Sequence, residues 1–591
     1  MVLLAVCCAT AKPASAQTTQ PEDKAESVHG VVVNSVTREP VGHALVYSPD
    51  DRFAAMTDGE GRFEFTFEPA PPAQMHGETG SGSISSICAE GTCTTYSASP
   101  QTPNRPNVLS AKRPGFLTDQ QGIANQQPVT PGKELTISLT PEALVVGRVT
   151  LPTSEASEAI QLELYRRQVA DGRARWVLAG SASTRSNGEF RFAELSAGTY
   201  KLLTRELPDR DPLTFDPRGQ QYGYPPVFFP NATDFAAAES IQVAAGQIFQ
   251  ADISLVRHPY YRVKVPVANL PPGVGAMNIV VSAQGNRGPG YSLGYNNQDQ
   301  TIDGLLPNGN YTLEASSYGP TPVSGLLNIS VKGAAVEGPS MSVAPGGSIS
   351  VNVKEEFTAP EDTDSQRAFV INGPRGTEQQ GPRRYLDVRL ESADDFGQER
   401  GGWPRPPSGP EDESLAFDNV QPGRYWVRAN SSRGFVASVT SGELDLLHQP
   451  LVVGVGGSSS PIEVTLRNDT AEIDGTVEGA AASPGVSEGS PSGYSNGFAN
   501  PAVESLAHVY CVPLPDSGGE FKYLPVSADG KFGPLELPPG TYRMLAFDHP
   551  QPELEYRDPE AMREYDAKGQ LVRLVAGQKE HVQLHLISNS E

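Results

Sequence analysis

The chain has 591 residues, which at roughly 100–200 residues per core corresponds to about three to six domains. Hydrophobic residues make up 38% and charged residues 19%, and glycine plus proline is about 19%, below the roughly 25–30% typical of disorder throughout. The formal net charge of −24 repels phosphate backbones and anionic lipid, which excludes a general nucleic-acid-binding role, whereas a basic partner fits. The composition therefore indicates a loop-rich multidomain protein.

The first residues read as an export signal. An apolar run from Val2 to Ala9 precedes the small-x-small triplet Ala14-Ser15-Ala16, which predicts a signal peptide over residues 1–16 and a linker over 17–27. A disordered apolar tail or a lipid-modified Cys7 are the alternatives. No later stretch approaches the roughly 18 apolar residues of a membrane helix, so we expect an extracytoplasmic protein, periplasmic or secreted, with no transmembrane segment after cleavage.

An internal period organises the rest of the chain. Gly-x-Tyr followed by alternating apolar residues recurs with its tyrosines, Tyr200, Tyr311, Tyr425 and Tyr542, spaced 111, 114 and 117 residues apart. A small-residue turn before an alternating strand occurs five times, the third time at Gly346-Gly347 before SISVNV, and is interpreted as the end of each repeat. The predicted repeats are 28–143 with an insertion over 68–107, 144–258, 259–355, 356–469, and 470–591 with a Gly/Ser-rich loop over 479–500.

Each repeat reads as strands. Asn187-Gly188 and Asp529-Gly530 predict two-residue hairpin turns with positive φ at both positions, each followed by a phenylalanine that begins a strand. The tyrosine ten residues after that phenylalanine suggests a tyrosine corner, with the ring inside and the hydroxyl bonded to a neighbouring loop. Helical periodicity is nearly absent. The fold class is therefore predicted to be all-β, a tandem array of about five antiparallel β-sandwiches of the immunoglobulin-like or transthyretin-like kind.

The first repeat carries a family resemblance. Its landmarks are Gly30, the turn Thr37-Arg38-Glu39-Pro40, the segment Thr57–Phe63 (TDGEGRF) and the later Arg113–Phe116 (RPGF). This pattern resembles the carboxypeptidase regulatory-like domain, a transthyretin-like sandwich related to carbohydrate-binding-like modules. The second and fifth repeats share GRV or GTV openings and DGxF…GxY cores, and the third and fourth keep only the later strands. The resemblance implies an accessory or binding role and no peptidase chemistry of its own.

Three cysteines remain after the predicted signal. Cys88 and Cys93 lie in the insertion of the first repeat, where after export they could close a small disulfide loop or stay as free thiols. Cys511 alternates with polar neighbours in AHVYCVPL and is predicted to be a small buried core residue.

We predict no catalytic residue, no metal site and no cofactor. The chain contains no HExxH pair, and His581 and His585 fall on the polar face of a strand. Two matches to G-x-S-x-G, at Gly485–Gly489 and Gly493–Gly497, lie in the Gly/Ser-rich loop and lack the strand-turn-helix setting of a nucleophile elbow. The carboxylates near Asp209 and Glu361 read as solvated loops.

One aromatic patch is a candidate ligand contact. The segment QQYGYPPVFFPNATD holds Tyr222, Tyr224, Phe228 and Phe229, whose rings could stack on a sugar or seat a peptide. The alternative is that these rings cover a sandwich edge or a domain junction. Trp403 has the same ambiguity.

The sequence as a whole predicts a non-enzymatic binding or scaffold protein of the cell envelope, whose partner is a protein or a glycan. A carbohydrate-binding protein that uses its loop aromatics is one alternative. An accessory subunit of a separate hydrolase is the other.

Overall fold

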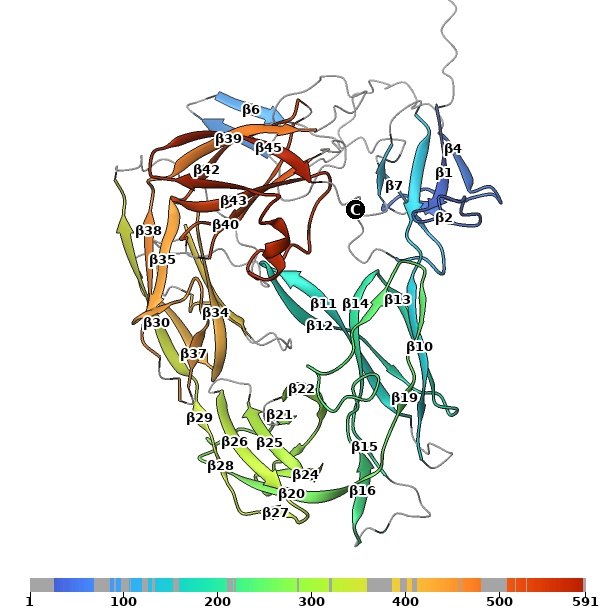
Figure 1. Ribbon diagram of the computed structural model, residues 1–591, viewed down its shortest axis with the longest axis vertical. Coiled ribbons are helices and arrows are strands. Elements are labelled where there is room, and N and C mark those ends of the chain that lie inside the picture. The colour runs from blue at the N-terminus through green and yellow to red at the C-terminus, as the bar shows by residue number, and fades with distance from the viewer. Residues whose placement is uncertain are drawn as a thin grey trace, which may run out of the picture. The chain divides into compact units, whose positions relative to one another are not determined.

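The computed structural model is an all-β structure without α-helices in the described part of the chain (Figure 1). It divides into two compact units, residues Met1–Glu142 and Ala143–Glu591, which we describe separately. The predicted signal peptide lies outside the described residues. The structure describes residues 26–50, 52–67, 85–89, 92–96, 106, 108–118, 126–129, 133–152, 159–209, 216, 219–283, 286–317, 322–358, 385–393, 401–406, 412–454, 456–457, 459–479, 507–515, 517–527 and 529–587.

The first unit holds the first repeat. Its sheets have the strand orders β4-β1-β9 and β3-β2-β7-β8, and β5 and β6 form a separate ladder. Its strands are β1 (Glu26–Asn34), β2 (Leu45–Tyr47), β3 (Ala54–Met56), β4 (Arg62–Phe67), β5 (Ser85–Ala89), β6 (Thr92–Tyr96), β7 (Val108–Lys112), β8 (Gln127–Pro128) and β9 (Leu135–Leu139).

The second repeat opens the second unit. Its two sheets are ordered β13-β10-β18 and β12-β11-β14-β17, with β19 also on β10. Its strands are β10 (Ala143–Thr150), β11 (Gln161–Ala170), β12 (Arg173–Ser183), β13 (Glu189–Leu195), β14 (Gly198–Thr204), β15 (Leu207–Pro208), β16 (Gln221–Tyr224), β17 (Ile241–Val243), β18 (Ile248–Gln250) and β19 (Ile253–Ser254).

The third repeat shares a sheet with the second, in the order β15-β16-β20-β24-β23 with β27 and β28 on β20; its other sheet is β22-β21-β25-β26-β29. Its strands are β20 (His258–Ala268), β21 (Asn278–Ala283), β22 (Asn286–Tyr291), β23 (Gly294–Asn296), β24 (Thr301–Pro307), β25 (Gly309–Ser316), β26 (Val323–Val331), β27 (Val336–Glu337), β28 (Met341–Ser342) and β29 (Ala344–Pro345).

The fourth repeat has the sheets β33-β30-β38-β35-β36 and β32-β31-β34-β37. Its strands are β30 (Gly347–Glu356), β31 (Leu386–Ser392), β32 (Gly401–Gly402), β33 (Leu415–Val420), β34 (Gly423–Ser431), β35 (Phe435–Ser441), β36 (Leu444–Asp445), β37 (Leu451–Val453) and β38 (Ile462–Arg467).

The fifth repeat is one continuous sheet, β41-β40-β43-β45-β39-β42 with β44 on β43, and it adds one 3-10 turn, η1 (Ala561–Tyr565). Its strands are β39 (Ala471–Glu478), β40 (His508–Pro513), β41 (Lys522–Pro525), β42 (Lys531–Leu537), β43 (Gly540–Phe547), β44 (Gln570–Leu574) and β45 (Lys579–Ile587).

One topology underlies all five repeats. The first strand pairs antiparallel with the strand that precedes the Gly-x-Tyr position or its equivalent, and parallel with a strand at the end of the repeat. Alternating residues of these strands point inward, as the burial of every second residue in β10 shows, and each repeat has its own cluster of buried apolar side chains. The described architecture is therefore an array of β-sandwich repeats, as the sequence predicts.

One strand belongs to a different repeat from the one predicted. The sequence pattern predicts SISVNV as the end of the third repeat, but Gly347–Glu356 (β30) pairs with β33 and β38, and Ile349 lies in the core of the fourth repeat. The reason is that a small-residue turn followed by alternating apolar residues precedes a first strand as readily as a last one. The other repeat limits given above stay a prediction.

The repeated tyrosines are corner residues. All four rings are 0–3% exposed. Each hydroxyl donates a hydrogen bond to the backbone carbonyl four residues earlier: Tyr200 to Ser196 (2.7 Å), Tyr311 to Pro307 (3.0 Å), Tyr425 to Gln421 (2.9 Å) and Tyr542 to Pro538 (2.7 Å). The ring fills the core while the hydroxyl holds the turn into its own strand, so the predicted structural role is confirmed.

The predicted two-residue turns have another geometry. Of the residues at Asn187-Gly188 and Asp529-Gly530, only the glycines have positive φ, 80° and 79°. The amide of Arg185 donates to the carbonyl of Glu189 and the amide of Gly188 to the carbonyl of Arg185, which is a type I turn closed by a glycine bulge. The prediction of a hairpin signal is right in position and wrong in turn type.

The glycine that opens three repeats has a steric function. A Cβ at Gly30 would lie 2.2 Å from the carbonyl oxygen of Leu135 and 2.8 Å from the ring of Phe63. The equivalent crowding recurs at Gly147 with Phe190 and at Gly475 with Phe532. The phenylalanine ring therefore lies over the glycine where the last strand passes closest to the first.

Replacing Tyr542 tests the corner. Tyr542→Ala removes a fully buried ring, so we expect the free energy of unfolding of the fifth repeat to fall by about 3–5 kcal/mol. Tyr542→Phe keeps the ring and loses one hydrogen bond, so a loss of about 0.5–1.5 kcal/mol is expected. Hydrogen exchange of the β39–β45 amides measures both. Leu571→Ala, at a 58% exposed position in the same repeat, is the control, and equal effects of Tyr542→Ala and Leu571→Ala would contradict the assignment.

Replacing Gly30 tests the close approach of the strands. Gly30→Ala forces β9 or Phe63 to move, so the first unit should lose roughly 1–3 kcal/mol. Gly59→Ala is the matched control, because a Cβ there has no heavy atom within 4 Å in the described structure. Thermal unfolding of the two variants measures the difference. If both variants unfold at the same temperature as the parent, the close approach at Gly30 does not require glycine.

Candidate functional site

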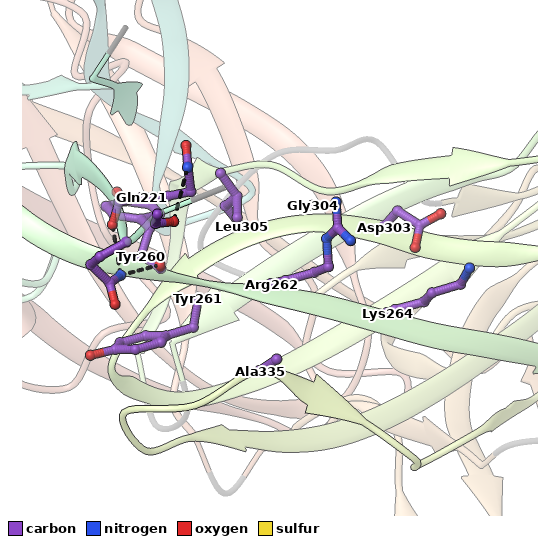
Figure 2. Close-up of a pocket in the computed structure, with 11 residues that line it drawn as sticks. Gln221, Tyr260, Tyr261, Arg262, Lys264, Asp303, Gly304, Leu305 and Ala335 are labelled. Carbon is purple, nitrogen blue, oxygen red and sulfur yellow. Dashed lines mark hydrogen bonds between the residues drawn. The ribbon is translucent and has the colours of Figure 1, made fainter. Parts of the chain in front are cut away.

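A polar pocket lies at the junction of the second and third repeats. Strand β16 pairs antiparallel with β20, Gln221 opposite Tyr260, so one sheet runs from one repeat into the next. The pocket has a volume of about 900 Å³ and lies along this shared sheet (Figure 2). Its lining residues are Gly219, Gln220, Gln221, Tyr260, Tyr261, Arg262, Lys264, Asp303, Gly304, Leu305 and Ala335.

Two glutamine side chains fix the second-repeat side of the pocket. The Nε2 of Gln220 donates to the carbonyl oxygens of Gln221 and Tyr260, both at 2.8 Å. The Nε2 of Gln221 donates to the carbonyls of Asp216 (2.7 Å) and Gly219 (3.2 Å). Because these amides bond to backbone on both sides of the junction, the wall of the pocket is held in place before any ligand arrives.

The third-repeat side carries charge of both signs. Arg262 and Lys264 come from β20, and Asp303 from the neighbouring strand β24, next to Gly304 (Figure 2). The Nζ of Lys264 lies 3.4 Å from the carboxylate of Asp299. These groups offer hydrogen-bond donors and an acceptor, and Tyr261, which also packs partly against the third core, is a further lining residue, so the pocket suits a polar ligand.

The buried carboxyl of Glu206 and the buried hydroxyl of Tyr260 lie at the same junction. Both the amide and the Oγ of Ser292 donate to the Oε1 of Glu206, at 2.6 and 2.8 Å. The Oε2 of Glu206 and the hydroxyl of Tyr260 are buried without a hydrogen-bond partner in the described part of the chain. Burial raises the pKa of Glu206 to about 7, against the opposing effect of the Ser292 bonds. Burial also raises the pKa of Tyr260, and the charge of Glu206 adds to that rise.

Three of the four predicted contact aromatics are buried. Tyr224 and Phe229 are 4% and 8% exposed and belong to the core of the second repeat, and Phe228 is 4% exposed and packs edge-on against Phe235. Tyr222 is half-buried, with the guanidinium of Arg257 4.0 Å from its ring centre. Ligand contact through these rings stays a prediction, and Tyr222 is the ring best placed for it.

The cysteine predictions have different outcomes. Cys511 is fully buried in the fifth core, and burial raises the pKa of its thiol to about 12, so the prediction of a buried core residue is confirmed. The backbone register places Cys88 directly opposite Cys93 in the β5–β6 ladder. A disulfide between them stays a prediction.

His581, His585 and Trp403 lie at solvent-exposed positions. His581 and His585 lie on the polar side of β45 and pair with Asp474 and Glu478 of β39. Trp403 is 51% exposed, with Arg389 5.9 Å from its ring centre. The G-x-S-x-G segments and the Glu361 cluster lie outside the described residues.

The described residues contain neither a metal-binding cluster nor a membrane-spanning helix. Within those ranges, no group of three or more His, Cys, Asp or Glu side chains could hold a metal ion. No helix in the same part of the chain is long and apolar enough to cross a membrane.

The pocket residues were not predicted from the sequence. Gln220 and Gln221 lie immediately before the aromatic patch, and Arg262 and Lys264 alternate with Val263 and Val265 on β20. That alternation signals a strand with a polar face, but nothing local indicates that β16 pairs with it.

Comparison with known proteins does not identify a family for this chain. No family model matches the chain, and no curated protein matches its sequence. Among solved structures, the chain is similar to the Bacillus anthracis TIE protein (10% identity, TM-score 0.14, 76% of this chain and 75% of that one) and to a streptococcal ancillary pilin (13%, 0.17, 55% and 99%). It is also similar to the pilus adhesin SpaC from Lactobacillus rhamnosus GG (11%, 0.16, 54% and 42%). At these TM-scores the likeness carries no argument about fold or function.

The raised pKa of Glu206 makes stability depend on pH. A carboxyl whose pKa rises from 4.5 to about 7 on folding stabilises the protein fully below pH 4.5, and this contribution, roughly 3 kcal/mol, is lost as the pH rises to 7. Glu206→Gln cannot ionise, so we expect the parent to lose about that much relative to this variant between pH 4.5 and 7.5. Urea unfolding measures it.

The control for this experiment is Glu337→Gln, at an exposed position in the third repeat. Its unfolding free energy should follow the parent at every pH. If the Glu206→Gln curve also runs parallel to the parent, Glu206 is not the group responsible.

Proposed function

We propose that this chain is an extracytoplasmic, non-enzymatic binding and scaffold protein of the cell envelope, with the junction pocket as its ligand-contacting surface. The observation that carries the proposal is the sheet that continues from β16 into β20. It fixes the second repeat against the third and lines a preformed polar pocket with residues from both. A rigid array with a polar recess between two modules is suited to holding a partner at a defined place.

The ligand class follows from the lining. Arg262 and Lys264 supply cationic donors, Asp303 and backbone carbonyls supply acceptors, and Tyr261 supplies a flat apolar face. This set suits a polar polymer presented in an extended form, either a protein segment or a glycan chain. The glycan reading gains weight if Tyr222 contributes its ring, and an accessory role beside a hydrolase remains the third alternative.

The family proposal accompanies the functional one. We infer that the repeats are modules of the carboxypeptidase regulatory-like kind, supported by the Gly30–Phe63 contact and its counterparts in the second and fifth repeats. Export by the segment 1–16 belongs to the same proposal.

Retention of envelope components tests the pocket. The full chain is immobilised and exposed to envelope extract, divided into protein and glycan fractions. Reversing the charge of Arg262 and Lys264 together should lower retention of the ligand by more than about tenfold, because two cationic contacts are replaced by repulsion.

Lys332→Glu is the matched control, because it reverses an exposed lysine in the same repeat outside the pocket lining. Loss with the pocket variant and retention with the control support the proposal. Equal retention by all three proteins overturns the role of the pocket. Enrichment of a hydrolase in the bound fraction would favour the accessory alternative.

A further inference from the structure

The longest hairpin of the second repeat ends in a two-residue turn that is unlike its other turns. Strands β11 and β12 pair from Gln161 with Ser183 to Ala170 with Arg173, and only Asp171 and Gly172 connect them. Both have positive φ, 49° and 69°, which is the type I′ geometry that favours Asp-Gly. The turn therefore holds the Asp171 carboxylate at the end of the hairpin, beyond a bulge at Leu164/Tyr165 and beyond the part of β11 that also pairs with β14.

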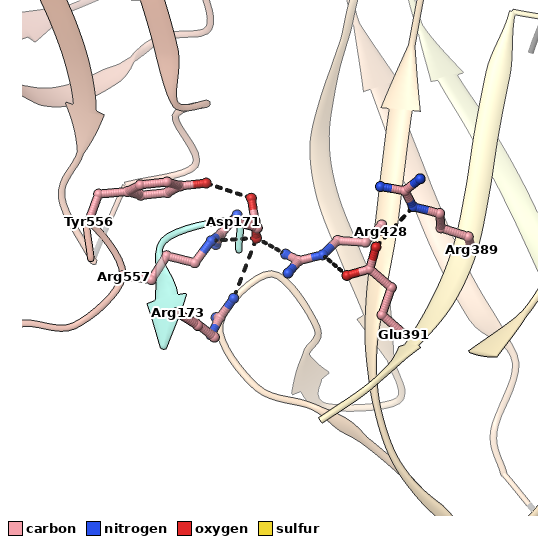
Figure 3. A network of polar contacts seen from close by, with 7 residues as sticks. All are labelled: Asp171, Arg173, Arg389, Glu391, Arg428, Tyr556 and Arg557. Atoms are coloured by element: carbon pink, nitrogen blue, oxygen red, sulfur yellow. Dashed lines mark hydrogen bonds and ion pairs between the residues drawn. The ribbon is translucent and has the colours of Figure 1, made fainter. Parts of the chain in front are cut away.

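The Asp171 carboxylate is the centre of a charge network contributed by three repeats (Figure 3). Arg173 comes from its own hairpin, Arg428 from β34 of the fourth repeat, and Tyr556 and Arg557 from the loop after β43 in the fifth. The hydroxyl of Tyr556 donates at 2.5 Å, and the Nε of Arg557 lies at 2.9 Å. The Nη1 of Arg173 lies at 3.6 Å, and Arg428 also pairs with this carboxylate.

The backbone of the turn fits the fifth repeat closely. The amide of Arg557 donates to the carbonyl of Gly172 at 3.0 Å. A Cβ on Gly172 would lie 2.6 Å from the ring of Tyr556, so only glycine permits this approach. The Tyr556 ring also stacks in parallel on the ring of Phe521, with ring centres 3.9 Å apart, and this contact holds it in position.

Further contacts lie on both sides of the turn. The guanidinium of Arg173 lies 3.6 Å from the ring centre of Trp426, and Arg167 pairs with Glu555 at 2.5 Å. On the fourth repeat, the Nε of Arg428 donates to Glu391 at 3.1 Å, which orients it toward the turn. Burial and the neighbouring Arg557 and Arg428 lower the pKa of Arg173 to about 10, as expected where guanidinium groups crowd around one carboxylate.

We propose that the β11–β12 hairpin is a clasp, whose Asp171-Gly172 tip docks reversibly into a socket formed by Trp426, Arg428, Tyr556 and Arg557 of the fourth and fifth repeats. The contact is mainly ionic, and the carboxylate of Asp171 keeps 34% of its side-chain surface in solvent. Partly exposed ion pairs are screened by salt. The clasp therefore holds the second repeat to the fourth and fifth at low ionic strength and releases them as salt rises, without unfolding any of them.

The amide of Arg557 reports the state of the clasp. It is bonded to the Gly172 carbonyl, so its hydrogen exchange requires the tip to leave the socket. In the full chain, Asp171→Asn keeps a residue that accepts positive φ and removes the charge. We expect exchange of the Arg557 amide to rise about tenfold or more, because charged hydrogen bonds are lost, while the β39–β45 amides stay at the parent rate.

Two further variants separate the clasp from simple structural damage. Asp209→Asn removes another carboxylate of the second repeat, which pairs with Arg257 at 2.6 Å, and should leave Arg557 exchange unchanged. Asp171→Gly keeps the turn and removes the carboxylate from the socket. Formate supplies a carboxylate, so it should restore the protection of the Arg557 amide from exchange. Chloride at equal ionic strength should not restore it. Protection in the parent should also fall as salt is added.

Unchanged Arg557 exchange in Asp171→Asn overturns the proposal. So does a rise that extends equally over the β39–β45 amides, because that would mean unfolding of the fifth repeat. An effect of Asp209→Asn as large as that of Asp171→Asn would also overturn it.

Discussion

Every repeat depends on the parallel pairing of its first strand with a strand at its end. In the fifth repeat this ladder runs from Glu472 opposite Lys579 to Glu478 opposite His585. Parallel neighbours cannot be joined by a tight turn, so the intervening chain must cross over, and here it does so by building the opposing strands of the sandwich. The closing ladder thus determines where the core is and why Gly30, Gly147 and Gly475 carry no side chain.

The corner tyrosines solve a second problem set by that crossover. The strand before the Gly-x-Tyr position and the strand that begins there are joined by a short turn, whose carbonyls would otherwise face the core edge without donors. The hydroxyl of Tyr542 bonds to Pro538 within that turn, and its ring packs with Met544 in the same core. One residue therefore fixes the turn and fills the interior, which explains its recurrence at the same place in four repeats.

These features could be predicted because their signals are local and repeat along the chain. Gly-x-Tyr at a regular period identifies the corner, and the strand pattern of AHVYCVPL predicts Cys511 as buried, although its neighbours Tyr510 and Val512 are buried too. The junction pocket depends on pairing between β16 and β20, and Asp171 meets Tyr556 across 385 residues. Neither partner carries a local sign of the other. The misplaced strand β30 has the same cause, since strand composition does not say with which neighbour a strand will pair.

The β11–β12 hairpin also sets the distance between its base and the Asp171-Gly172 turn. Its strands have 10 and 11 residues, and at about 3.3 Å per residue the turn stands roughly 33 Å from the base. Deleting one residue from each strand would draw the carboxylate back by about 3.3 Å and rotate it to the opposite face of the ribbon. Substitutions along the exposed edge, such as at the 50% exposed Leu178, leave that distance unchanged. The position of the Asp171 carboxylate therefore depends on the number of residues in the two strands. It tolerates changes of exposed side chains and does not tolerate insertions or deletions.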